Sequence, residues 1–188
     1  TPWHKDTTSP EKAGHSFHLK TDFLMAAAGF YLQDNDEDGG GLTVLEGSHR
    51  TADPLASLES IGLSGRLQRR LGLYSEQDDR RLNPHGHSIV DVRSKAGDLL
   101  VFHLRTSHRA TLPADGKTAK VPKSKEKIGF FCTFGADNEP TREYLDYLCG
   151  RPEPFYRSLR ERRPSPELEA HARKLGFALA SARSASSR

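Results

Sequence analysis

A histidine and a carboxylate stand two residues apart near the start of the sequence, in the run Trp3-His4-Lys5-Asp6. Residues two apart on a β-strand point to the same side, so His4 and Asp6 can present an imidazole and a carboxylate to one metal ion. A third nitrogen ligand from a distant strand would complete the two-histidine, one-carboxylate set of non-haem Fe(II) oxygenases. A His-x-Asp tripeptide also arises by chance on protein surfaces, so the rest of the chain has to decide between these interpretations.

Short apolar segments separated by turn signals predict a mainly β architecture. The turns include the charged, glycine-rich segment 34–41 and Ala96-Gly97-Asp98, and a polar, lysine-rich loop follows at 113–125. Several short strands with such turns between them indicate a sandwich or barrel. The predicted strands lie at 21–33, 42–45, 88–92, 99–103 and 127–134.

Two segments break this β pattern. Residues 51–83 carry leucines at helical spacing, which predicts an insertion of one or two helices. Residues 151–188 hold nine Lys or Arg against four Asp or Glu, and the run from Pro164 to Glu167 predicts the start of a helix over 166–179. We therefore divide the chain into a core of residues 1–150, which contains the insertion, and a C-terminal helical extension with a basic tail at 151–188.

Composition excludes several classes of protein. The 188 residues suit a single domain, and no apolar run approaches the roughly 18–20 residues that span a bilayer. The net charge of +3 is too small to indicate a nucleic-acid partner, and two cysteines are too few for a disulfide scaffold. We expect Cys132 to be buried and the setting to be cytoplasmic, since no signal peptide is visible. Because the chain opens at Thr1, we expect a further N-terminal part to precede it.

Three runs in the sequence carry a resemblance when they are taken together. They are Trp-His-Lys-Asp at 3–6, Gly-Gly-Gly-Leu-Thr-Val-Leu-Glu-Gly-Ser-His-Arg at 39–50, and Gly-Asp-Leu-Leu-Val-Phe-His at 97–103 followed by Ser107-His108. In order and spacing they resemble the phytanoyl-CoA dioxygenase-like family of Fe(II)- and 2-oxoglutarate-dependent oxygenases, although Glu46 stands where the family usually has proline. The resemblance implies a double-stranded β-helix core, of the jelly-roll or cupin-like type, with flanking α-helices.

The resemblance also implies the residues of a site. By position, His4, Asp6 and His108 match the three iron ligands of the family. A carboxylate at position 6 favours hydroxylation, or a related desaturation or ring closure, over halogenation, because halogenating relatives have a small residue there. Tyr31 and Gln33 match the strand face that borders the co-substrate 2-oxoglutarate.

The far carboxylate of 2-oxoglutarate needs a cationic partner, which in the family is an arginine at the start of the last core strand. Here Lys127 takes that place, and lysine is a point charge that cannot form the planar fork of an arginine. Alternation supports Lys127, because Gly129 and Phe131 would share its face and the glycine would leave room beside the ligand. Lys125 is the alternative with the same parity, and Arg109 is a weaker one.

The other histidines fit the family pattern less well. We interpret His103 as a core or pocket residue and His49 as part of a structural turn in which Ser48 can act as a cap. The remaining histidines lack a matching position, although His15 or His18 could line a substrate pocket; they are His15, His18, His85, His87 and His171.

The function that follows from the resemblance is oxidative. With Fe(II), 2-oxoglutarate and O2 as cofactors, we expect hydroxylation of an unactivated C–H bond of a small molecule, with release of succinate and CO2. Two other functions stay open: a cupin-like metal enzyme that does not use 2-oxoglutarate, and a jelly-roll binding module without catalysis. We expect neither nucleic acid nor membrane as a partner.

Overall fold

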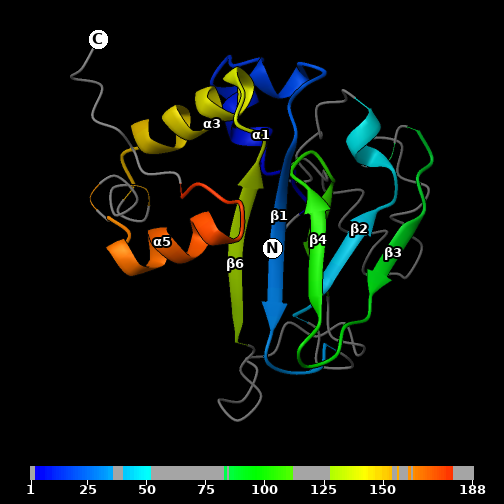
Figure 1. Ribbon diagram of the computed structural model, residues 1–188. Helices are drawn as coiled ribbons and strands as arrows, with labels where there is room; N and C mark the ends of the chain where they lie inside the picture. Colours follow the sequence, from blue (N-terminus) through cyan, green and yellow to red (C-terminus); the bar gives the residue numbers. More distant parts are fainter. Residues whose placement is uncertain are drawn as a thin grey trace. The chain divides into compact units, whose positions relative to one another are not determined.

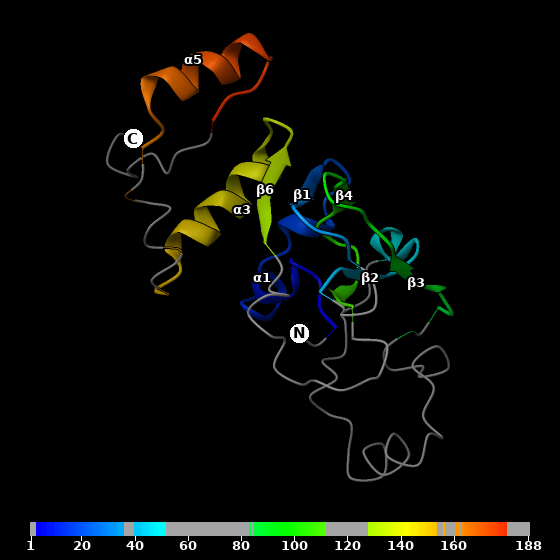
Figure 2. The same cartoon turned by 90° about the horizontal axis from the view of Figure 1, so that it is seen from below.

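In the part of the chain that the structure describes, six strands form two antiparallel sheets of three strands each, with the orders β4-β1-β6 and β3-β2-β5. This confirms the expected mainly β architecture, while the complete double-stranded β-helix stays a prediction. Figure 1 shows β6, β1 and β4 side by side with β2 and β3 beyond β4, and Figure 2 shows the same order from below. The strands are β1 (Met25–Tyr31), β2 (Leu42–Leu45), β3 (Ile89–Val92), β4 (Leu99–His103), β5 (His108–Ala110) and β6 (Gly129–Gly135).

The computed structural model describes residues 3–35, 40–51, 83, 85–111, 128–153, 156, 161 and 163–179. The helical insertion expected at 51–83 and the lysine-rich loop at 113–125 therefore fall outside the described residues, apart from the two ends of the insertion. Among the described residues, three short helical segments lie in the first compact unit, Thr1–Ala136, and two longer helices lie in the second, Asp137–Arg188. They are α1 (Thr8–Lys12), η1 (Phe17–Leu19), η2 (Ser48–Arg50), α3 (Glu139–Gly150) and α5 (Pro166–Lys174).

The register of the first sheet defines which side chains face the same way. In the centre of the sheet, Ala27 of β1 pairs with Phe102 of β4 and Thr133 of β6. Directly paired residues share one side of a sheet, and so do residues two apart on one strand. The side that carries Phe102, which we call the Phe102 side, therefore also carries the buried Tyr31. His103 lies on the opposite side.

The second sheet is organised around β2. Val44 pairs with His108 of β5 and with Val90 of β3, so these three side chains share one side. On the other side the buried Leu45 packs with Trp3 and Ile89. The two sides thus separate a hydrophobic cluster from a side that carries His108.

A serine hydroxyl joins the end of β2 to the start of β5. Ser48 is 2% exposed, and its Oγ donates to the Leu45 carbonyl oxygen (2.7 Å) while it accepts from the Ser107 N–H (2.9 Å). The Leu45 N–H returns a bond to the Ser107 carbonyl oxygen (2.9 Å). Gly47, with a φ of 76°, opens the turn in a conformation that favours glycine. The Gly-Ser-His turn is structural, but Ser48 does not cap η2 as expected, because its hydroxyl bonds to Leu45 and Ser107 instead. These bonds fix the residue before His108.

The helices of the second unit differ from the sequence expectation in two ways. Helix α3 was not anticipated, although Asn138 caps its first turn by accepting from the Thr141 N–H (3.2 Å). Helix α5 ends at Lys174 instead of 179, because Gly176 adopts a φ of 79° and the backbone N–H groups of the next residues turn back to the last carbonyls. The division at residue 150, drawn from composition, stays a prediction.

The expectation for Cys132 was wrong: this cysteine is exposed. Its strand, β6, is the last described strand on one side of the first sheet, and nearly all its side chains are exposed on both sides. None of the described helices is long and apolar enough to cross a membrane.

Replacing Ser48 by alanine tests the link between β2 and β5. The change leaves the buried Ser107 N–H without its acceptor, so Ser48→Ala is expected to lower the free energy of unfolding by about 1–3 kcal/mol. Urea unfolding followed by circular dichroism measures the change. Ser16→Ala is the matched control, because Ser16 is exposed and its hydroxyl caps no helix. Equal midpoints for the two variants would show that the Ser48 bridge contributes nothing to stability.

Candidate metal centre

The segment that carries His4 and Asp6 runs beside the start of β5. The His4 N–H donates to the His108 carbonyl oxygen (2.9 Å), and the His108 N–H donates back to the His4 carbonyl oxygen (2.8 Å). The Asp6 N–H donates to the Leu104 carbonyl oxygen (3.2 Å). This pairing is antiparallel and places His4 directly opposite His108. The two imidazoles therefore start from the same side of the extended backbone.

The side chains of His4, Asp6 and His108 converge on one point. Asp6 Oδ1 lies 3.9 Å from His4 Nε2 and 3.8 Å from His108 Nε2, and the donor atoms of all three residues lie within 4.8 Å of one another. Neighbouring ligands of one octahedral ion, each about 2.1 Å from it, stand about 3 Å apart. The three donors thus surround a volume that suits a single metal ion. In the part of the chain that the structure describes, no other three His, Cys, Asp or Glu side chains meet in this way.

His108 is the most enclosed member of this triad. Its side chain is 9% exposed, against 38% for His4 and 30% for Asp6. His108 Nδ1 lies 2.9 Å from the Thr106 carbonyl oxygen. Because a carbonyl can only accept, Nδ1 carries the proton and Nε2 turns its lone pair towards Asp6.

Burial lowers the pKa of His108 below its ordinary value, and the negative charge of Asp6 opposes that shift only in part. The ring of Phe102 contributes to the enclosure, with its centroid 4.8 Å from that of His108. The neutral imidazole, which is the form that binds a metal, therefore prevails at neutral pH.

The other candidate histidines do not join the triad. Both ring nitrogens of His103 are engaged, since Nε2 faces the Phe23 carbonyl oxygen (3.2 Å) and Nδ1 accepts from the Arg105 N–H (3.1 Å). His49 stacks on His103 with a centroid distance of 5.6 Å. His18 is buried in η1. Three others lie in exposed or half-buried turns and on an exposed helix face; they are His85, His87 and His171.

Tyr31 and Gln33, expected beside the co-substrate, lie at the end of β1. Tyr31 is buried on the Phe102 side, and burial raises the pKa of its phenol. The ring of Phe131 meets it edge to face (5.8 Å) and lies so close to Gly29 and Gly129 that a Cβ at either glycine would come within 3.0 Å of that ring. Gln33 Oε1 accepts from the Ile128 N–H (2.7 Å), while its Nε2 has no hydrogen-bond partner among the described residues.

Three basic residues were proposed to bind the far carboxylate of 2-oxoglutarate, and the structure describes one of them. Lys127 and its alternative Lys125 lie outside the described residues. Arg109 is the neighbour of His108 on β5 and so faces the other side, where its guanidinium carbon stands 5.0 Å from the centre of the Trp3 ring. The geometry thus directs Arg109 away from the triad. Gln33 bonds to the Ile128 N–H, so the segment after β1 meets the residue before β6.

Two groups that surround His108, the Thr106 carbonyl and the Phe102 ring, were not predicted from the sequence. The Thr106 carbonyl oxygen, which sets the tautomer of His108, is a backbone atom that any residue would supply. Phe102 lies on a strand that was predicted, next to His103. Its contact with His108, however, depends on how the two sheets meet.

Comparison with known proteins places these observations in a family. The family model for phytanoyl-CoA dioxygenase (PhyH) matches residues 1–112. No curated protein matches the chain. Among solved structures, the chain is similar to one described as "Crystal Structure of EvdMO1", with 19% identity and a TM-score of 0.38, over 73% of this chain and 23% of that chain.

The family match covers more than half of the chain and contains all three residues of the triad. Members of this family are typically iron-dependent oxygenases, and two imidazoles with one carboxylate are a donor set that suits non-haem iron. The chain therefore belongs to the phytanoyl-CoA dioxygenase family.

Proposed function

We propose that this chain carries the iron site of a 2-oxoglutarate-dependent oxygenase that hydroxylates an unactivated C–H bond of a small molecule. The observation that carries the proposal is the convergence of His4, Asp6 and His108 in a member of this family. Three ligands on one side of an octahedral ion leave three positions for a bidentate co-substrate and O2. We also propose that the two sheets are the halves of a double-stranded β-helix.

Iron at this site would supply oxidative chemistry in which one atom of O2 enters the substrate C–H bond and the other enters succinate, while 2-oxoglutarate loses CO2. The residues of the protein would hold the iron and orient its ligands. The Thr106 carbonyl keeps the proton of His108 on Nδ1, so that Nε2 stays available as a ligand. Phe102 shields one side of this imidazole from water. The carboxylate of Asp6 occupies the position that a halide needs, which supports hydroxylation.

The co-substrate is proposed to lie along the Phe102 side, with its far carboxylate at Lys127 and with Tyr31 and Gln33 beside it. Support comes from the burial of Tyr31 on that side and from the Gln33 bond to Ile128, the neighbour of Lys127. The Nε2 of Gln33, which has no hydrogen-bond partner within the described segments, is a donor suited to a carboxylate oxygen.

An anaerobic titration with Fe(II) and then 2-oxoglutarate tests the proposal directly. Wild-type protein is expected to develop a weak visible charge-transfer band near about 500 nm, typical of such a chelate at an open iron site. His4→Ala and His108→Ala are expected to abolish the band, because each removes one of three protein ligands. His171→Ala, which removes an exposed imidazole on α5, is the control and should leave the band unchanged.

The other outcomes of this titration separate the alternatives. Metal binding without a band, and without succinate when O2 is admitted, would favour a cupin-like enzyme that does not use 2-oxoglutarate. Loss of metal binding altogether in a folded wild-type protein would favour a binding module.

Lys127→Ala tests the partner of the far carboxylate. Loss of a charge-assisted hydrogen bond is expected to raise the 2-oxoglutarate concentration at half-saturation of the band by about 10- to 100-fold, with the final intensity unchanged. Lys174→Ala, at the exposed end of α5, is the matched control. An unchanged half-saturation point in Lys127→Ala, with a raised one in Lys125→Ala, would move the role to Lys125.

Removing Phe102 tests the pKa of His108. Burial holds this pKa below the usual value of 6.5, so the ring stays neutral, and able to bind Fe(II), to a lower pH than an exposed histidine would. Phe102→Ala admits water, raises the pKa towards 6.5 and is expected to move the acid limb of Fe(II) affinity, measured between pH 5 and 7.5, to higher pH. Val101→Ala, the exposed neighbour on the opposite side of β4, should not move it. Superimposable profiles for all three proteins would contradict this account of the enclosure.

A further inference from the structure

A part-buried arginine beyond the end of β4 lacks an anionic partner among the described residues. Arg105 Nη1 donates to a neutral acceptor, the His18 carbonyl oxygen (3.3 Å), and its buried Nε makes no hydrogen bond there. No carboxylate of the described residues forms an ion pair with it. A guanidinium is charged at every relevant pH, and a charge that is partly removed from water needs compensation.

His18 lies beside this arginine and is equally short of partners. Its residue is 2% exposed, and neither ring nitrogen forms a hydrogen bond with the described residues. Burial lowers the pKa of His18, and the positive charge of Arg105 lowers it further against the opposing charge of Glu11. The neutral ring therefore has one N–H donor and one acceptor nitrogen that the surrounding described residues leave unused.

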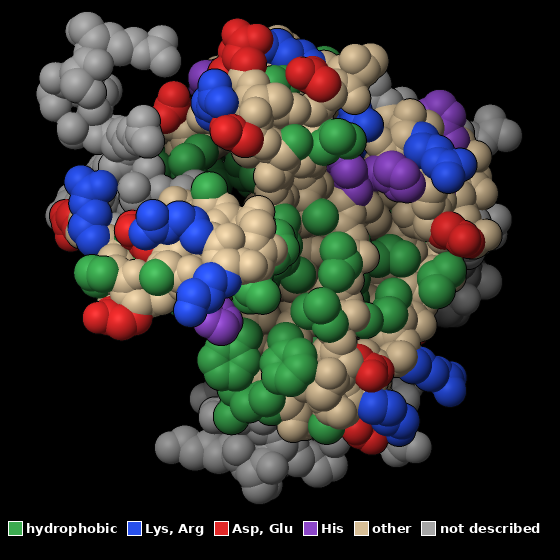
Figure 3. All heavy atoms as spheres, in the orientation of Figure 1, with side chains coloured by type: hydrophobic (Ala, Val, Ile, Leu, Met, Phe, Trp, Pro, Cys, Tyr) green, Lys and Arg blue, Asp and Glu red, His purple; other side chains and the backbone are tan. Residues whose placement is uncertain are grey.

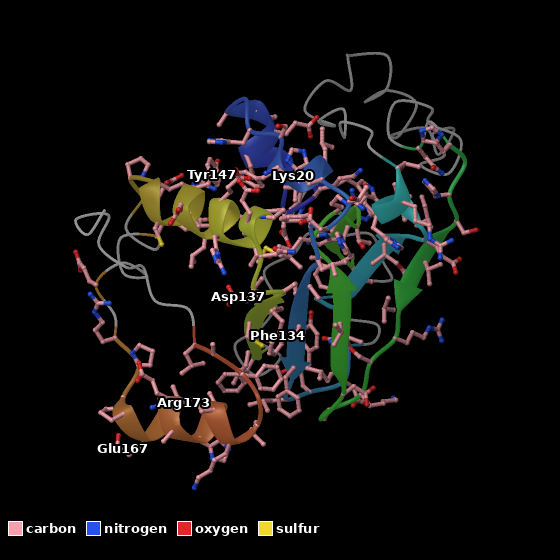
Figure 4. All side chains as sticks on the ribbon, turned by 45° about the horizontal axis from the view of Figure 1, so that its top comes forward. Lys20, Phe134, Asp137, Tyr147, Glu167 and Arg173 are labelled. Atoms are coloured by element: carbon pink, nitrogen blue, oxygen red, sulfur yellow. The ribbon has the colours of Figure 1, made fainter. Side chains whose placement is uncertain are left out.

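Two more imidazoles complete what we call the basic cluster: Arg105, His18, His49 and His103. The backbone N–H of Arg105 donates to His103 Nδ1, and this bond fixes the backbone from which the guanidinium extends. His49 stacks on His103. Histidine side chains gather with Lys and Arg side chains near this end of the sheet in Figure 3. Figure 4 labels Lys20, the residue that directly follows η1, the helical turn that contains His18.

The basic cluster is separate from the metal triad but is joined to it by the backbone. The Leu104 carbonyl oxygen accepts from the Asp6 N–H (3.2 Å), so the residue before Arg105 is hydrogen-bonded to the backbone of Asp6. His103 is not available as a ligand of the metal triad, because both of its ring nitrogens already have partners. The loop between β4 and β5 thus carries Arg105 at one end and leads to His108 at the other.

We propose that Arg105 and His18, supported by His103 and His49, form a binding site for a single carboxylate or phosphate group, and that this group is the anionic end of the small-molecule substrate. The assignment of the anion to the substrate rests on the proposed oxygenase function. An anion would give Arg105 a charged partner in place of a carbonyl and would accept the N–H of the buried His18. The site would hold one end of the substrate while the reacting C–H bond reaches the triad.

The test uses the metal-free full chain, treated with a chelator, so that it does not depend on iron. The thermal midpoint is measured against inorganic phosphate and, separately, against acetate, at an ionic strength held constant with sodium chloride. A specific site raises the midpoint in a saturable way. Arg105→Gln keeps a hydrogen-bond donor but removes the charge, and it is expected to raise the Kd of the anion by about tenfold or more. His18→Asn is a second variant for the case in which Arg105→Gln does not fold. Arg93→Gln is the control, an exposed arginine of the same unit.

The site is supported if the saturable stabilisation is lost in Arg105→Gln or His18→Asn, while the Kd of Arg93→Gln stays within about twofold of wild type. The anion that binds more tightly, phosphate or acetate, then identifies the chemical group that the site prefers. No saturable effect in wild type, or the same Kd in Arg105→Gln and Arg93→Gln, overturns it. The charge-transfer titration keeps the two proposals apart. Arg105→Gln should leave the Fe(II)–2-oxoglutarate band and its half-saturation unchanged. A raised half-saturation with unaltered phosphate binding would assign Arg105 to the co-substrate and overturn the proposal.

Discussion

The metal triad depends on one pair of hydrogen bonds, those that His4 and His108 exchange through their backbones. They bring together residues that stand at opposite ends of the matched part of the chain and set both imidazoles on one side. Other features secure this pairing: the Ser48 hydroxyl anchors the residue before His108, and the cluster of Trp3, Leu45 and Ile89 packs next to His4. The site is thus built by sheet pairing, and its side chains follow from the register.

Histidines in two neighbouring groups meet different electrostatic surroundings. His108 is buried beside the carboxylate of Asp6 and has a carbonyl to hold its proton, so its second nitrogen is directed at a defined point. His18 is buried beside a guanidinium and has no described hydrogen-bond partner for its ring. Both imidazoles therefore have a carboxylate nearby, Asp6 in one case and Glu11 in the other, and the guanidinium of Arg105 is what sets His18 apart. The proposed anion site depends on that guanidinium.

Much of the fold followed from local sequence, and the exceptions have physical reasons. The strands were recognisable because glycine-rich turns bound them, whereas β5 has only three residues, too few to show alternation. The early end of α5 depends on the backbone conformation of Gly176. His4 and Asp6 were identifiable from their spacing of two. His108 required the family resemblance, since eight histidines besides His4 compete for the third ligand position and only the register shows which one faces His4.

The arrangement of the second sheet has a consequence for how such proteins diversify. Val44 stays in register between His108 and Val90 although a long connection separates β2 from β3 along the chain. The entropy of closing a loop grows slowly, by about 0.6 kcal/mol for each doubling of its length. Evolution can therefore lengthen, shorten or exchange that connection at little thermodynamic cost, without disturbing the register that places His108 opposite His4.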